Sequence, residues 1–155
     1  MKHPKDAGDH TTLAVLLALH ESGYQVATPF GESERYDLSL DDGEKLLRVQ
    51  CKTGRVRLGT VEFATAGSYA HHPNEKPTQR HDAGQVDHFA VYCRETGGVY
   101  LIPTGVLPLD RAYLRVTAPQ NGQRKRIRHA KDYEIARVGC RAAEGADRRR
   151  ELSPG

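Results

Sequence analysis

The stretch that decides the fold is residues 35–52, which read RYDLSLDDGEKLLRVQCK. Apolar and polar residues alternate on both sides of the segment Asp41-Asp42-Gly43, and an Asp-Gly pair between alternating runs is typical of a hairpin turn. The stretch therefore predicts a β-hairpin whose strands cover residues 35–40 and 45–52.

The predicted hairpin brings four residues with useful chemistry together. Since side chains alternate between the two faces of a strand, Gln50 and Lys52 share one face and Cys51 points to the other. Folding the hairpin brings Asp37 close to that pair. A carboxylate and the backbone carbonyl of Cys51 can bind magnesium, and a lysine can orient or deprotonate a water that attacks phosphorus. The alternative is an exposed Asp37–Lys52 ion pair with no chemical role.

Outside the hairpin, the pattern predicts one α/β domain. Asp9 or Thr11 is a suitable cap for a helix that runs through residues 13–21 and stops at Gly23. A turn is expected at Thr53-Gly54. Further strands are expected at 24–27, 60–65, 87–93, 98–103 and 113–117, with a short helix at 130–135. The 155 residues suit a single domain, which we assign to 1–138, followed by a basic tail at 139–155 that we expect to be disordered.

The net charge of +3 is too small to identify a partner, but the cations are clustered. Arg124, Lys125, Arg126 and Arg128 lie within five positions, and Arg148–Arg150 follow in the tail. Such clusters suit contact with phosphate groups, although a solvated loop explains the first cluster equally well and a disordered tail explains the second better.

The sequence indicates a cytoplasmic protein with reduced thiols. Its three cysteines, Cys51, Cys93 and Cys140, are an odd number without paired spacing, which argues against a disulfide framework. No apolar run reaches the length of about 18 residues that a membrane-spanning helix needs, so we expect no membrane partner. The apolar segment 13–19 is short and is better explained as a buried helix than as a signal peptide.

Several blocks of the sequence, in order, resemble the group I intron-associated PD-(D/E)xK endonuclease family. The likeness spans roughly residues 8–134 and is carried by Pro29-Phe30-Gly31-Glu32, Arg35-Tyr36-Asp37-Leu38, Arg48-Val49-Gln50-Cys51-Lys52-Thr53, Ser68-Tyr69, residues 87–93, residues 99–103 and Asn121-Gly122-Gln123-Arg124. The resemblance implies a restriction-endonuclease-like α/β core with a mixed central β-sheet and flanking helices. It also implies a homing- or restriction-like endonuclease that cuts double-stranded DNA with magnesium, or manganese in its place, as a dimer or tetramer.

Carried over residue by residue, the family's metal-binding aspartate falls on Asp37 and its lysine on Lys52. Gln50 takes the position of the acidic residue in the general nuclease motif. The resemblance thus implies that Asp37, Gln50 and Lys52 are catalytic, and that Asp37 and the Cys51 carbonyl bind the metal.

One position departs from the family pattern. Thr12 stands where members often have a glutamate on the first helix, and a single carboxylate holds magnesium poorly. Asp9, Glu21 or Glu32 are the candidates for a second metal-binding carboxylate. The departure keeps two alternatives open: a DNA-binding module of the same fold that has lost catalysis, and a structural or partner-binding protein.

Two groups of polar residues outside the hairpin are further candidates. By resemblance, the residues expected to contact DNA are Tyr69, His71, His72 and Arg80, together with Arg55 and the cluster Arg124, Lys125, Arg126 and Arg128. A zinc site built from His71, His72, His81, His88 and Cys93 is disfavoured, because their spacing matches no tight ligand pair.

Overall fold

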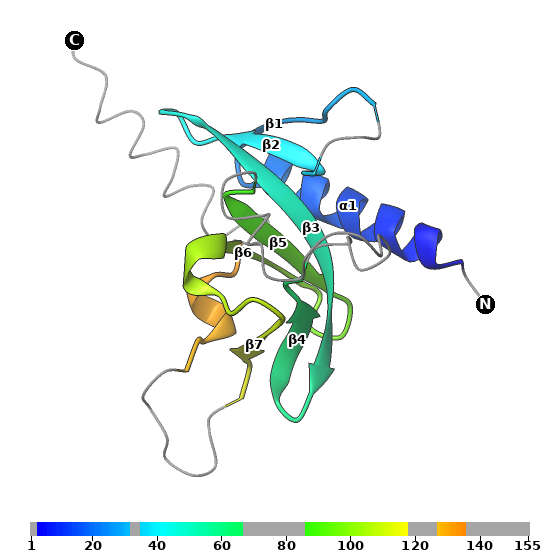
Figure 1. Cartoon of the computed structure of the whole chain (residues 1–155), viewed down its shortest axis with the longest axis vertical. Helices are drawn as coiled ribbons and strands as arrows, with labels where there is room; N and C mark the ends of the chain where they lie inside the picture. The colour runs from blue at the N-terminus through cyan, green and yellow to red at the C-terminus, as the bar shows by residue number, and fades with distance from the viewer. Residues whose placement is uncertain (1–2, 32–34, 67–85, 118–126, 136–155) are drawn as a thin grey trace, which may run out of the picture.

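The computed structural model of the chain describes residues 3–31, 35–66, 86–117 and 127–135. Its elements, in chain order, are α1 (Pro4–Glu21), β1 (Gln25–Ala27), β2 (Leu38–Asp41), β3 (Leu46–Arg57), β4 (Thr60–Ala64), β5 (His88–Cys93), β6 (Gly98–Pro103), the 3₁₀ turn η2 (Thr104–Val106), β7 (Arg111–Arg115) and the 3₁₀ turn η3 (Ala130–Asp132) (Figure 1). No helix in the described ranges is long and apolar enough to cross a membrane.

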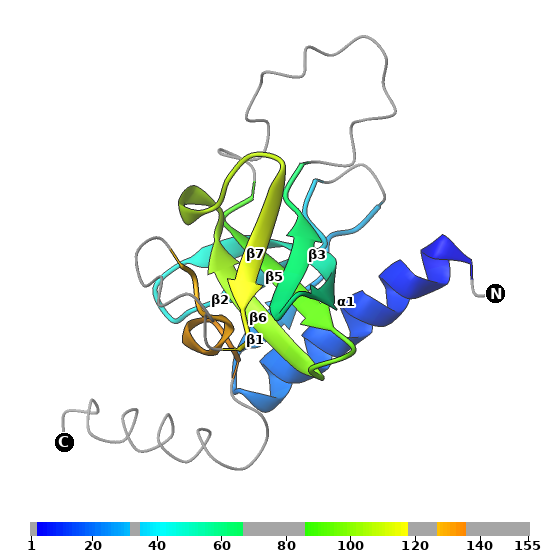
Figure 2. The same ribbon diagram turned by 90° about the horizontal axis from the view of Figure 1, so that it is seen from below.

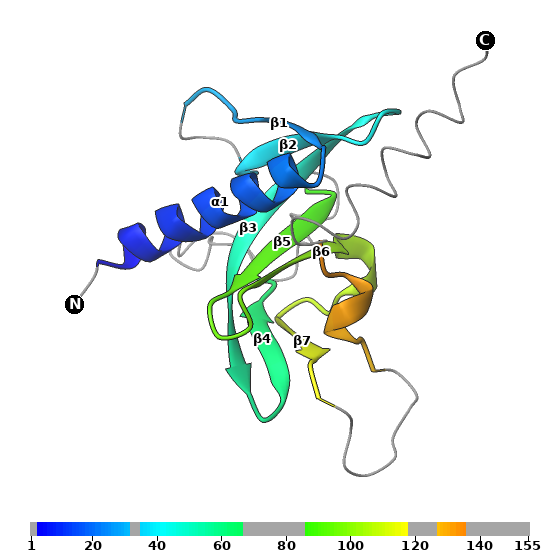
Figure 3. The same cartoon turned by 180° about the vertical axis from the view of Figure 1, so that it is seen from behind.

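The sheet is mixed and is organised around β3. β2 and β4 pair with β3 in antiparallel fashion, whereas β5 pairs with it in parallel. β1 extends the sheet beyond β2, and β7 pairs with the outer edge of β4. β6 pairs with β5, and the two strands lie side by side in Figure 2. This arrangement confirms the expected mixed α/β core. In the described residues one α-helix, α1, packs on the sheet, chiefly against β3 and β5 and also against β1 and β6 (Figure 3).

Two hydrophobic clusters cover the two faces of the sheet. The helix-side cluster packs Val15 and Leu19 of α1 against Leu38, Val49 and further residues of the sheet. The far-side cluster fills the space between β5, β6 and the strands β4 and β7; its most buried large members include Val61, Val91, Ile102 and Leu114. The sheet therefore has a core on each side, and residues of β3 alternate between them.

The helix begins earlier than the sequence analysis expected. The caps proposed at Asp9 or Thr11 are wrong, because α1 starts at Pro4. His3 caps it: the His3 ring nitrogen accepts from Lys5 N–H, and the Asp6 carboxylate accepts from His3 N–H. This reciprocal pair of hydrogen bonds satisfies two backbone donors at the helix start, and proline is well suited to the first helical position.

Strand β3 continues through the segment Thr53-Gly54, where a turn was expected. A Cβ at Gly54 would lie 2.6 Å from one Val61 methyl carbon and 2.8 Å from one of Val91. The glycine thus serves close strand packing rather than a turn. The chain reverses later, at Leu58 and Gly59, whose φ angles of 51° and 74° are typical of a two-residue hairpin loop.

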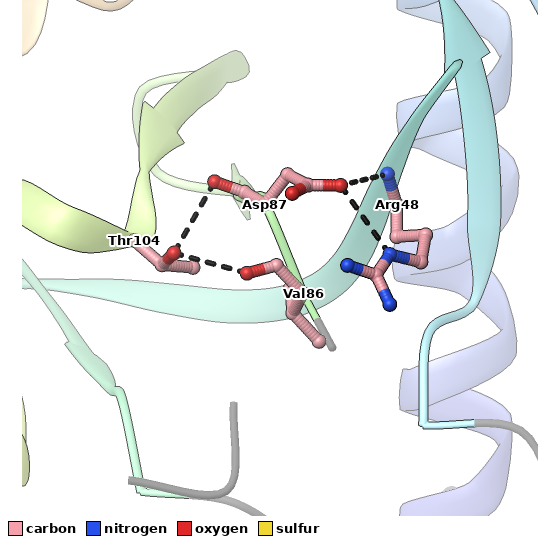
Figure 4. A network of polar contacts seen from close by, with 4 residues as sticks. All are labelled: Arg48, Val86, Asp87 and Thr104. Carbon is pink, nitrogen blue, oxygen red and sulfur yellow. Dashed lines mark hydrogen bonds and ion pairs between the residues drawn. The ribbon is translucent and has the colours of Figure 1, made fainter. Parts of the chain in front are cut away.

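A polar network joins β3 to the start of β5 (Figure 4). The Asp87 carboxylate accepts from Arg48 N–H at 2.8 Å and from Arg48 Nε at 3.4 Å, while Asp87 N–H donates to Arg48 O at 2.9 Å. The Thr104 hydroxyl donates to the carbonyls of Val86 and Asp87. Burial raises the pKa of Asp87, but the hydrogen bonds from Arg48 outweigh it and hold that pKa below its ordinary value. The network fixes the register of the parallel pair.

Candidate active site

One edge of β3 is open in its middle. β2 pairs with β3 up to Val49, and β4 pairs with it from Arg55 onward. Between them, residues 50–54 pair with β5 on one edge, and no described strand occupies the other. Backbone and side-chain groups at this interval are therefore available to a ligand, which makes it the place to look for a site.

Asp37 is fixed at this open edge. It precedes β2 rather than lying within a strand of residues 35–40, since β2 begins at Leu38. Its N–H donates to Val49 O at 2.9 Å, and its carboxylate Oδ2 accepts from Cys51 N–H at 2.7 Å. Because the N–H and C=O of one strand residue point to the same edge, the Cys51 carbonyl is directed to the edge that Asp37 occupies. Two oxygen donors thus share this edge.

Gln50 has a buried oxygen that lacks a partner. Its Oε1 atom is buried and accepts no hydrogen bond from any described residue. Leaving such an acceptor unsatisfied costs about 1–3 kcal/mol. Gln50 is adjacent in sequence to Cys51, whose N–H binds Asp37, so a cation or a polar ligand at this point would satisfy the orphaned oxygen.

Lys52 is held on the far-side face of β3. Its Nζ donates to Ala66 O at 3.3 Å and lies 5.5 Å from the centre of the Phe89 ring. Phe89 belongs to the far-side cluster, and it pairs in register with Gln50. Alternation along β3 places Gln50 on the same face. The ammonium group is therefore positioned by a backbone carbonyl and an aromatic ring.

Cys51 lies on the helix-side face of β3, and its thiol is a poor nucleophile. It packs against the helix-side cluster, as alternation predicts. Burial, reinforced by the negative charge of Asp37, raises the pKa of its thiol to about 12. A thiol with this pKa is almost wholly protonated at neutral pH, so Cys51 contributes its backbone rather than a nucleophile.

The oxygens at this site fit a hard divalent cation. Carboxylate, amide and peptide oxygens are the ligands that magnesium prefers, and Asp37, Gln50 and Cys51 supply one of each. In the described residues no group of three or more His, Cys, Asp or Glu side chains is arranged to hold a metal. The site thus offers suitable donor atoms but little negative charge.

Thr12 lies beside Cys51, and two of the three candidate carboxylates lie on the same helix. The Thr12 hydroxyl donates to Gly8 O at 3.1 Å and also hydrogen-bonds the Cys51 thiol. Asp9 is exposed one turn away on α1. Glu21 lies nine residues beyond Thr12, roughly 13 Å along the helix axis, which separates it from the Cys51 level. Glu32 lies outside the described residues.

Of the expected DNA contacts, the structure describes Arg55 and Arg128. Tyr69, His71, His72, Arg80, Arg124, Lys125 and Arg126 lie outside the described residues, as do His81 and the tail at 139–155. Arg55 is exposed on β3, not in a turn, and the Arg128 guanidinium donates to Val106 O. His88 is half-buried with its Nδ1 unpartnered by described residues, and burial lowers its pKa. It joins no described cluster with Cys93, so the zinc alternative gains nothing.

The sequence analysis missed Ala66 and Thr11, two residues that support the site. The Ala66 carbonyl holds Lys52, and no residue type signals a functional backbone carbonyl. The Thr11 hydroxyl lies 2.6 Å from that of Thr53, tying α1 to β3 directly beside the open edge. A threonine in an otherwise apolar stripe of the helix was the available signal, because a buried hydroxyl needs a partner.

The chain resembles two solved structures and matches one family model. A bacterial homing endonuclease, I-Ssp6803I, superposes with a TM-score of 0.61 over 97% of this chain and 99% of its own, at 22% identity. A Holliday junction resolvase, Hjc of Archaeoglobus fulgidus, superposes with a TM-score of 0.43 over 70% of this chain and 84% of its own, at 9% identity. No curated protein matches the sequence. The family model for PD-(D/E)XK endonucleases matches residues 2–136, and the chain therefore belongs to the PD-(D/E)XK endonuclease family.

Proposed function

We propose that this chain is a magnesium-dependent DNA endonuclease of the group I intron-associated, homing- or restriction-like kind. The observation that carries the proposal is the buried oxygen of Gln50, which has no partner among the described residues and lies on a strand interval where Asp37 is also fixed. A metal-binding role explains why an acceptor is left unsatisfied there, because orphaned buried polar groups cluster at functional sites.

Each residue then has a defined role. The Asp37 carboxylate, the Gln50 amide oxygen and the Cys51 carbonyl would hold the ion, magnesium or manganese. When bound, the ion makes a water more acidic and offsets the charge of the phosphate. Lys52 orients the attacking water and stabilises negative charge on the phosphate oxygens as the new oxygen–phosphorus bond forms and the bond to the leaving oxygen breaks. Its hydrogen bond to Ala66 O limits the positions that the ammonium group samples.

The proposed substrate is double-stranded DNA. Cutting both strands needs two sites, so we infer a homodimer or a tetramer. Arg55, exposed three residues beyond Lys52 on the same strand, would contact a phosphate near the cut. The other contacts proposed are Tyr69, His71, His72 and Arg80, by resemblance, and the basic cluster Arg124, Lys125, Arg126 and Arg128, from its charge.

A second candidate is a DNA-binding module that has lost catalysis. The observation that favours it is Thr12, whose neutral hydroxyl contacts Cys51 where a carboxylate would add charge to the site. With Asp37 as the one charged ligand, magnesium affinity would be weak.

The test is a cleavage assay on supercoiled and linear DNA with magnesium, manganese or a chelator. Wild type is compared with Lys52→Ala and with Lys45→Ala, an exposed lysine in the β2–β3 turn. We expect metal-dependent cutting by wild type and Lys45→Ala, and none by Lys52→Ala. Retardation of DNA without cutting under any metal condition would favour the binding module, and neither cutting nor retardation would refute both proposals.

A further inference from the structure

The outer face of the small antiparallel sheet formed by the end of β3, β4 and β7 carries a set of arginines. Strand register places Arg57, Thr60 and Arg115 side by side across the three strands. The next row holds Arg55, Glu62 and Tyr113, and the row after it holds Ala64 and Arg111. We call Arg55, Arg57, Arg111, Tyr113 and Arg115 the arginine face.

The alternation of buried and exposed residues turns this face to solvent. Val61 and Phe63 of β4, and Leu114 of β7, project to the opposite side, where they are 0–2% exposed in the far-side cluster. Side chains between them must point outward. Arg55 and Arg57 are exposed accordingly, and the Tyr113 side chain is 51% exposed between two arginines of its own strand.

Two acidic groups near this face, Glu62 and Glu95, already have partners among the described residues. Glu62 forms an ion pair with Arg111. The pKa of Glu95 is lowered, first by a hydrogen bond from its own backbone, then by contacts that include the Cys93 thiol and the charge of Arg55. In the described part of the chain, no carboxylate forms an ion pair with Arg57 or Arg115. Arg115 reaches over the hairpin tip and donates to Leu58 O at 3.4 Å. The face therefore keeps a positive surplus at Arg57 and Arg115.

The face is within reach of the same duplex as the site. Lys52 and Arg57 are five residues apart on one strand, roughly 17 Å at the rise of a β-strand, and this odd spacing makes their side chains project from opposite faces of β3. A full turn of B-form DNA spans about 34 Å, so this separation corresponds to about half a turn. A duplex that lies against the open edge of β3, where both faces of the strand are bordered, would extend along β3 to these arginines.

We infer that the arginine face binds phosphates of duplex DNA on the flank of the cleavage site, with Arg57 and Arg115 making the principal contacts. This inference rests on the proposed function, because it takes the substrate to be DNA. Guanidinium groups bind phosphate oxygens through paired hydrogen bonds, and an exposed tyrosine between two of them adds a further hydroxyl donor. The contacts read the backbone rather than the bases, so they fix where the duplex lies without choosing its sequence.

The experiment measures DNA binding without cleavage. DNA affinity is measured from the fluorescence anisotropy of a labelled duplex, in the presence of a chelator, between 50 and 200 mM salt. Three proteins are compared: wild type, the double variant Arg57→Ala with Arg115→Ala, and a control double variant, Lys5→Ala with Lys45→Ala. Each lost phosphate contact lowers the slope of log affinity against log salt by about 0.9. We expect the slope to be lower by about 1.8 for the arginine variant. Between 50 and 200 mM salt, the factor by which DNA affinity falls should therefore be about 12 times smaller for this variant than for wild type. The control removes the same number of charges from exposed positions outside the face and should keep a slope nearer that of wild type.

The outcomes separate this inference from the proposed function. An arginine variant whose slope matches that of the lysine control overturns the arginine face, even if wild type binds and cuts DNA. Wild type that cuts DNA with magnesium but shows no binding in this assay overturns the inference alone, and wild type that neither binds nor cuts DNA overturns the inference together with the proposed function. The double variant could lose binding by misfolding, because it removes the hydrogen bond from Arg115 to Leu58 O. Arg57→Ala alone keeps that hydrogen bond and should still lower the slope by about 0.9.

Discussion

Cys51 allows the orientation of β3 to be tested by thiol chemistry. Its pKa of about 12, against an ordinary 9.0, lowers the thiolate fraction at pH 8 about 1,000-fold. A more basic thiolate is a better nucleophile, with a Brønsted coefficient of about 0.4–0.5, which recovers part of that loss. The net expectation is exchange with a small aromatic disulfide about 30- to 60-fold slower than for a free thiol of ordinary pKa. Burial against α1 slows it further.

The assay is pulse labelling at pH 8 followed by peptide mass spectrometry, which separates Cys51 from Cys93 and Cys140. Asp37→Asn should accelerate the exchange of Cys51, because it removes the second cause of the raised pKa. If Cys51 in wild type reacted as fast as the free thiol, it would not face the helix-side cluster. Gln50 and Lys52 would then not share the far-side face, and the proposed site would be wrong.

Three further predictions concern the strand and its surroundings. Gly54→Ala should lower the free energy of unfolding by about 1–3 kcal/mol, measured by urea titration, because its Cβ would overlap two valine side chains; an unchanged midpoint would contradict the packing. Because the pKa of Asp87 is lower in the folded state, its ionised carboxylate stabilises the fold at pH values above the ordinary pKa of 3.8. This stabilisation is lost as the pH falls through the lowered pKa of the folded state. Asp87→Asn should therefore lose less melting temperature than wild type between pH 7 and pH 3. Thr12→Glu should tighten magnesium binding measured by calorimetry, with Thr12→Gln as the uncharged control; equal affinities would place position 12 outside the metal's reach.

Much of the fold could be predicted from local patterns. The hairpin around Gly43 followed from its turn residues, and the alternation along residues 46–52 correctly put Cys51 on the face opposite Lys52, which the structure identifies as the helix side. Patterns of this kind are reliable because one face of each strand is buried, so the register is fixed by which residues must avoid water.

The remaining features depend on contacts between distant segments. Gly54 signals a turn in the sequence, but it lies within a strand because side chains of β4 and β5 fill the space above it. The hydrogen bond that Lys52 donates to Ala66 O involves a backbone carbonyl, and no sequence pattern identifies such a carbonyl. The start of α1 was missed because histidine is an uncommon cap, and its capping box became apparent only from the geometry.

The placement of the site on β3 has a consequence for the order of folding. The antiparallel partners of β3 are close in sequence, 11 residues apart for Leu38 and Val49, whereas the parallel partner of Val49 is His88, 39 residues away. Closing the longer loop costs about 1 kcal/mol more of chain entropy. Since residues 50–54 find their described strand partner only in β5, we expect their amides to gain hydrogen-exchange protection after those of the β2–β3 hairpin. A nascent chain whose β5 has not yet left the ribosome would then hold a folded hairpin but no assembled site, so the site would assemble only after synthesis has passed Cys93.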